Sequence, residues 1–114
     1  MNTESLVHLF HILIIGGLFL YVGIQTTNIP KIMFPILLAV GIIIILYHTF
    51  KVYIKMINGK GYWVNLIHIL LVGPLLLYIG YNGDKTARLY FELLLMLAFA
   101  SIGYHGYYFA LALE

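Results

Sequence analysis

The chain has 114 residues, of which 63% are hydrophobic and only 9% charged, and its mean hydropathy is +1.02. A water-soluble domain of this size needs a polar surface larger than its core, and so few charged side chains do not supply one. The net charge of +2 is too small to indicate a nucleic-acid partner, and the lack of cysteine excludes disulfides, thiolate metal sites and covalently attached c-type haem.

The apolar residues form four runs without any charged side chain, at residues 5–24, 32–50, 61–83 and 93–113. Each run approaches or exceeds the roughly 20 residues that a helix needs to cross the hydrocarbon core of a bilayer. Lipid offers no hydrogen-bond partner to the backbone, so each run is expected to be helical. The sequence therefore predicts an all-α, four-transmembrane-helix bundle that is a multi-pass integral protein with the lipid bilayer as its partner.

In chain order, the predicted helices cover residues 5–25, 32–53, 63–81 and 86–111. A turn with Pro30 separates the first two helices, and a loop with Asn58 and Gly59 separates the second from the third. At the start of the fourth helix, Arg88 and Glu92 are one helical turn apart and are expected to pair.

The chain contains one pattern twice, at an offset of 57 positions. Residues 7–25, VHLFHILIIGGLFLYVGIQ, align without a gap on residues 64–82, VNLIHILLVGPLLLYIGYN. Tyr47 and His48 likewise align on Tyr104 and His105. We therefore predict two copies of a two-helix hairpin, residues 1–57 and 58–114, within one membrane domain. Small residues at matching places of both copies are expected to allow close helix packing: Gly16, Gly23, Gly73 and Gly80.

A unit with two spans keeps its orientation when it is duplicated, so the two hairpins are expected to be parallel, related by a two-fold axis along the membrane normal. Both termini then lie on one side of the membrane. Lysine and arginine are divided evenly between the two sides, and the free amino terminus favours the cytoplasm for the termini.

Each predicted helix carries a histidine, and the four are His11, His48, His68 and His105. At about 1.5 Å rise per residue, all four lie at nearly the same depth, one or two turns inside the apolar layer. A fifth, His8, lies one turn nearer the surface, and Asn65 is its counterpart in the second copy. Ionisable groups inside a membrane often mark a functional site, so the sequence predicts a histidine cluster.

The leading interpretation of this cluster is a transition-metal or haem site. Neutral imidazole is the commonest biological metal ligand, and four imidazoles at one level can hold Zn, Cu or Fe. Alternatively, a diagonal pair ligates one haem b, and the small residues Gly41 and Ala98 leave a gap for the flat ring.

Two other interpretations stay open. Imidazoles that titrate near neutral pH can form a proton pathway or a pH-sensing, channel-like protein, with Tyr47 and Tyr104 passing hydrogen bonds. Four helices pack too closely for an open pore, so conduction would need a water wire or a homo-oligomer. In the third interpretation the histidines only bond to tyrosines or carbonyls, and the protein is a structural membrane module. No nucleophile stands beside a base, so an enzyme is not expected.

The phrases NLIHILLVGPLLLYIGY and LYFELLLMLAFASIGYHGYYF resemble small duplicated four-span membrane proteins predicted in large DNA viruses of algae and protists. The resemblance covers nearly the whole chain. It implies a viral protein in a viral or host-derived membrane, and it implies no activity.

Overall fold

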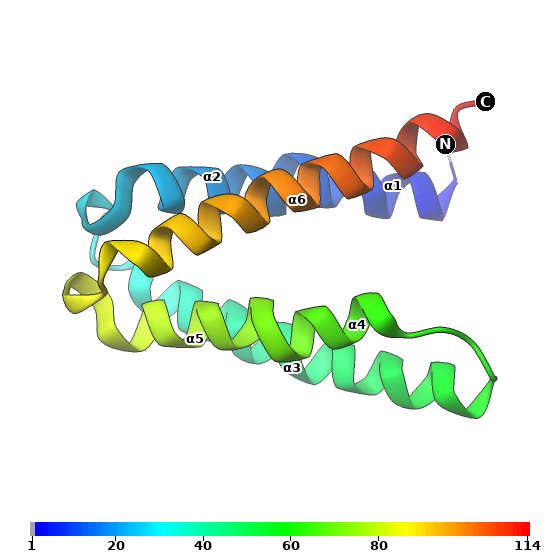
Figure 1. Ribbon diagram of the computed structural model, residues 1–114, viewed down its shortest axis with the longest axis horizontal. Helices are drawn as coiled ribbons and strands as arrows, with labels where there is room; N and C mark the ends of the chain where they lie inside the picture. The colour runs from blue at the N-terminus through cyan, green and yellow to red at the C-terminus, as the bar shows by residue number, and fades with distance from the viewer. Residues whose placement is uncertain (1) are drawn as a thin grey trace. The chain divides into compact units, whose positions relative to one another are not determined.

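The fold class predicted from the sequence is confirmed by the computed structural model, which describes residues 2–114 (Figure 1). These residues form helices and short connections, and no strand occurs among them. Four helical stretches are long and apolar enough to cross a membrane: Thr3–Asn28, Met33–Ile57, Trp63–Lys85 and Arg88–Ala112. The chain is thus a small polytopic membrane protein whose helices require a bilayer.

Two of the four stretches are divided into shorter elements. The first consists of α1 (Thr3–Phe10), the π-helix η1 (His11–Ile15), α2 (Gly16–Gln25) and the 3₁₀ turn η2 (Thr26–Asn28). The third consists of α4 (Trp63–Ile67), the π-helix η3 (His68–Val72), α5 (Gly73–Asn82) and the 3₁₀ turn η4 (Gly83–Lys85). The second and fourth stretches are the single helices α3 (Met33–Ile57) and α6 (Arg88–Ala112).

The helices pack as two compact units. In unit 1, which comprises residues 2–26 and 87–114, the first stretch packs against α6. In unit 2, residues 27–86, α3 packs against α4, η3 and α5. Each unit therefore takes one helix from each half of the sequence. The predicted repeats, residues 1–57 and 58–114, are defined by sequence similarity and not by packing, so they do not coincide with these units. The two-repeat division stays a prediction.

In unit 1 a glycine brings α2 close to α6. A Cβ atom on Gly23 would lie 3.0 Å from Leu95 Cβ and 3.1 Å from the Leu95 backbone. A Cβ on Gly16 would lie 2.7 Å from the Ile102 side chain. The buried core beside these contacts contains Phe19, Val22, Phe91, Leu94 and Ala98. The prediction that these glycines serve close packing is confirmed for unit 1.

Unit 2 uses the corresponding glycines in the same way. A Cβ on Gly80 would lie 2.7 Å from the backbone atoms Leu38 N and Phe34 O of α3, and a Cβ on Gly73 would collide with the Ile45 side chain. The backbones of α3 and α5 are therefore in direct contact at Gly80. The buried apolar side chains of this unit include Leu37, Leu76 and Ile79.

Large apolar side chains also cover the exposed faces of both units. Leu13 and Ile24 of unit 1 are 61% and 63% exposed, and Ile43 and Leu46 of unit 2 are 62% and 67% exposed. Water-soluble monomers rarely expose apolar surface on this scale. These side chains are therefore suited to contact with acyl chains.

The two π-helices are a feature that the sequence did not predict. Gly16 donates its N–H to His11 O, and Gly73 donates its N–H to His68 O, five residues back in each case. Pro74 follows η3 closely, but Gly17 holds the matching place after η1, so proline is not the cause. Such turns often occur at functional sites, and each of these two begins at a histidine.

Candidate functional site

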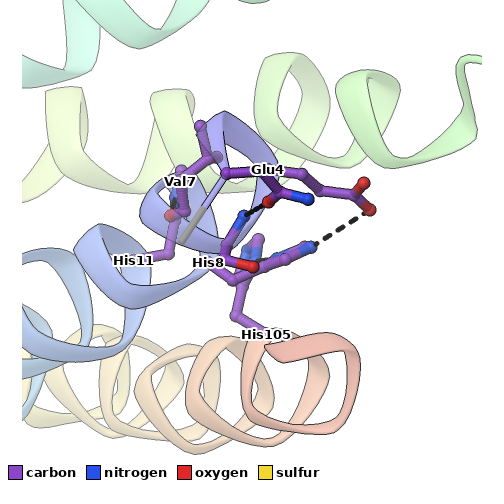
Figure 2. A network of polar contacts seen from close by, with 7 residues as sticks. Glu4, Val7, His8, His11 and His105 are labelled. Carbon is purple, nitrogen blue, oxygen red and sulfur yellow. Dashed lines mark hydrogen bonds and ion pairs between the residues drawn. The ribbon is translucent and has the colours of Figure 1, made fainter. Parts of the chain in front are cut away.

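Three histidines meet in unit 1 (Figure 2). His8 of α1 and His105 of α6 approach through their Nδ1 atoms, which are 2.9 Å apart. The rings of His11 and His105 are stacked, with centroids 4.3 Å apart and an interplanar angle of 24°. The buried ring of His105 therefore touches two imidazoles from the first helical stretch.

The bond between His8 and His105 requires one hydrogen for two nitrogens, because one Nδ1 must donate and the other must accept. Glu4 lies on the other side of His8, with Oε1 3.8 Å from His8 Nε2. The side chain of Glu4 is 72% exposed, whereas that of His8 is 12% exposed. The three groups thus connect the protein surface to a buried imidazole, as Figure 2 shows.

The backbone fixes the hydrogen of His11. Its Nδ1 lies 2.8 Å from Val7 O, and a carbonyl oxygen can only accept, so His11 Nδ1 carries the hydrogen. In the neutral ring, Nε2 then keeps its lone pair. His68 repeats this arrangement in unit 2, where its Nδ1 donates to Val64 O over 2.8 Å.

Unit 2 contains the second histidine pair. The rings of His48 and His68 are stacked, with centroids 4.0 Å apart and an interplanar angle of 15°. Asn65 occupies the place that His8 has in unit 1, and its Nδ2 lies 2.9 Å from His48 Nδ1. Lys55 donates from Nζ to Asn65 Oδ1 over 2.6 Å. Asn65 itself is only 5% exposed.

The supporting residues predicted from the sequence lie next to these pairs or in the packing below them. Tyr47 and Tyr104 each meet the following histidine edge-on, with ring centroids 5.2 Å and 5.0 Å apart. A Cβ on Gly41 would lie 3.1 Å from Gly73 O, so α5 takes the space over this glycine. Ala98 is fully buried. A haem ring that entered beside Gly41 would have to displace α5.

The stacked pairs do not have the geometry of two ligands that share a metal. Ring-nitrogen lone pairs lie in the plane of the imidazole, so two nearly parallel stacked rings direct them past each other. A metal at about 2.0 Å from both nitrogens would require one ring to rotate. Within residues 2–114, no group of three or more His, Cys, Asp or Glu side chains is arranged to hold a metal ion. The predicted cluster of four histidines takes two residues from each unit, and it stays a prediction.

Sequence reasoning overlooked the polar partners of the histidines. The sequence identifies Asn65 as the counterpart of His8, but it does not predict that Glu4, Lys55 and Asn65 take part in the polar contacts of the histidines. For Asn65 the sequence spacing gives an indication, because this residue lies one helical turn before His68, as His8 lies one turn before His11. A polar residue at this point of an apolar helix indicates a partner on the neighbouring helix.

Comparison with family models, curated proteins and solved structures gives no match for this chain. The resemblance to viral membrane proteins stays a prediction.

Proposed function

We propose that this membrane protein takes up and passes protons at the His8–His105 pair, as part of a proton pathway or a pH sensor. The observation that supports the proposal is the 2.9 Å contact between the two Nδ1 atoms. Imidazole takes up and releases protons near neutral pH and has two nitrogens, so it can accept a proton at one and release a proton from the other.

The hydrogens on the rings of His8 and His105 can be assigned for a resting state in which both rings are neutral. Glu4 Oε1 lies 3.8 Å from His8 Nε2, which is too far for a hydrogen bond, but the negative charge of the carboxylate favours a hydrogen on this nitrogen and so leaves His8 Nδ1 as an acceptor. His105 then carries its hydrogen on Nδ1 and donates it to His8. In this state both rings are neutral and the single shared hydrogen belongs to His105.

From this resting state the histidine pair can pass one proton, because one proton enters at His105 for each proton that leaves at His8. A proton arriving at His105 Nε2 makes that ring cationic, and its Nδ1 proton then passes to His8 Nδ1. His8 is now the cation, beside the Glu4 carboxylate, and it releases its Nε2 proton to Glu4 or to water. Both rings end in the opposite tautomer, so a second passage in the same direction requires the rings to reset.

Proton flux into liposomes that enclose a pH-sensitive dye tests this role. We expect His8→Asn to lower the flux at least tenfold, because an amide cannot exchange its hydrogens in the same way. Tyr107→Phe, which alters an exposed side chain of α6, should leave the flux unchanged. Wild-type protein that moves no protons and takes none up on acidification would overturn the proposal.

A transition metal (Zn, Cu or Fe) or haem b is the second candidate. The observation that favours it is the bond of His11 and His68 to backbone carbonyls, since metal-binding histidines usually anchor their other nitrogen in this way. Elemental analysis and the absorption spectrum of purified protein test it. Stoichiometric metal or a Soret band that His48→Ala with His105→Ala abolishes would support this candidate, and colourless, metal-free protein would contradict it.

We also propose that both termini face the cytoplasm. The contact between His8, near the start of α1, and His105, near the end of α6, supports a shared side for these two helix ends. Single cysteines at Asn2 and Glu114 can be labelled in intact cells with an impermeant maleimide. Labelling of either one from outside would contradict the proposal.

A further inference from the structure

The hydrogen bonds around Asn65 fix the orientation of its amide. Lys55 Nζ lies 2.6 Å from the amide, and an ammonium group can only donate, so the atom that faces it must be the oxygen. The amide nitrogen therefore faces His48 Nδ1, at 2.9 Å. Because Asn65 is buried, its amide has little freedom to exchange these partners for water.

This orientation determines the tautomer of His48. An amide NH₂ only donates, so His48 Nδ1 must accept, and the hydrogen of the neutral ring lies on Nε2. We infer that Lys55 and Asn65 are positioning residues that hold His48 in this single tautomer. The Lys55 ammonium group orients the Asn65 amide, and the amide in turn fixes the tautomer of His48. This arrangement requires no carboxylate.

The neighbouring ring is fixed in the opposite sense. His68 donates from Nδ1 to Val64 O, so its neutral form carries no hydrogen on Nε2. The stacked pair of unit 2 therefore combines one ring with hydrogen on Nε2 and one with hydrogen on Nδ1.

Unit 1 lacks this restraint. His8 replaces Asn65, and an imidazole, unlike an amide NH₂, can either donate or accept at Nδ1. The charge of Glu4 favours the hydrogen on His105, but at 3.8 Å from His8 Nε2 this carboxylate makes no hydrogen bond that would hold it there. The place of Lys55 is taken by Ala112, 57 residues further on (112 − 55 = 57). Taken with the proposed function, on which this step rests, the two histidine pairs are unequal: unit 1 can pass a proton between rings, and unit 2 is held in one state.

Nitrogen NMR of ¹⁵N-histidine-labelled protein in bilayers tests the inference, at a pH alkaline enough for the imidazoles to be neutral. We expect the wild-type His48 hydrogen on Nε2. Asn65→Asp should move it to Nδ1, because a carboxylate only accepts, and Lys55→Met should give both tautomers, because the amide can then rotate. The His68 signal, with hydrogen on Nδ1 throughout, reports that the variants are folded.

A transplant provides the converse experiment. His8→Asn combined with Ala112→Lys rebuilds the unit 2 arrangement in unit 1, and His105 should then carry its hydrogen on Nε2 alone. Hydrogen on Nδ1 of wild-type His48, or no change of the His48 tautomer in Asn65→Asp or Lys55→Met, would overturn the inference. These readouts do not depend on proton flux, so they separate a failure of this inference from a failure of the proposed function.

Discussion

Thr26 and Gly83 end their helices in the same backbone conformation. Thr26 has φ 56° and ψ −127°, and Gly83 has φ 56° and ψ −130°. Glycine adopts this conformation without steric conflict, whereas a β-branched residue does so only under strain. The turn after α2 therefore carries a strain that the turn after α5 avoids.

The first prediction follows from this difference. Thr26→Gly should raise the free energy of unfolding by about 1 kcal/mol, since it removes backbone strain of about 1–3 kcal/mol and loses only the local bond from Thr26 Oγ1 to Gln25 O. Gly83→Thr should lower it by about 1–3 kcal/mol. Circular dichroism during SDS unfolding in mixed micelles measures both. Equal destabilisation by the two substitutions would contradict the argument.

The second prediction concerns the backbone contact in unit 2. Gly80→Ala should lower the free energy of unfolding by about 1–3 kcal/mol, because its Cβ would lie 2.7 Å from two backbone atoms of α3. Gly103→Ala is the matched control, since nothing lies within 4 Å of its Cβ. The same unfolding experiment should find the control neutral or slightly stabilised, and a loss in both variants would contradict the packing argument.

Much of this architecture could be predicted from the sequence, because lipid imposes strict rules on it. The four spans follow from the charge-free runs, and the helix ends differ from the predictions by a few residues, as at Ile57, where α3 runs four residues beyond its predicted end. The Arg88–Glu92 pair is confirmed, with Nε and Oε1 3.1 Å apart. These features depend on local spacing, which the sequence displays directly.

Helix pairing and histidine partners could not be predicted in the same way. Similarity between the halves relates His11 to His68, yet the structure stacks His11 on His105 and His48 on His68. Similarity identifies equivalent positions and carries no information about which helix packs on which. The π-helices escaped prediction for a related reason, because HILII and HILLV suit an ordinary helix and their hydrogen bonds differ only by one residue in register.

The third prediction tests the lipid-facing surface. Ile43 lies near the middle of α3 and is 62% exposed, whereas Met56 lies near the end of the helix and is 58% exposed. An arginine at the centre of a spanning helix costs about 2.5–3.5 kcal/mol in insertion, and one at the end reaches the headgroups. Ile43→Arg should therefore reduce insertion of this helix in a glycosylation-mapping assay, and Met56→Arg should not. Equal insertion would show that residue 43 does not face lipid.

The fourth prediction tests the helix pairs themselves, and the absence of native cysteine makes it free of background. A Cβ on Gly16 would lie 2.7 Å from Ile102 Cγ1, so Gly16→Cys with Ile102→Cys places two sulfurs within reach of a disulfide in unit 1. Mild oxidation in membranes should crosslink this pair, which a shift on a non-reducing gel detects. Gly17→Cys with Ile102→Cys is the control, because a Cβ on Gly17 has no neighbour within 4 Å and so does not contact Ile102. Since a disulfide tolerates only a narrow range of Cβ separations, crosslinking of the control as fast as the test pair would mean that the first and fourth spans are not held in the register that brings His8 to His105.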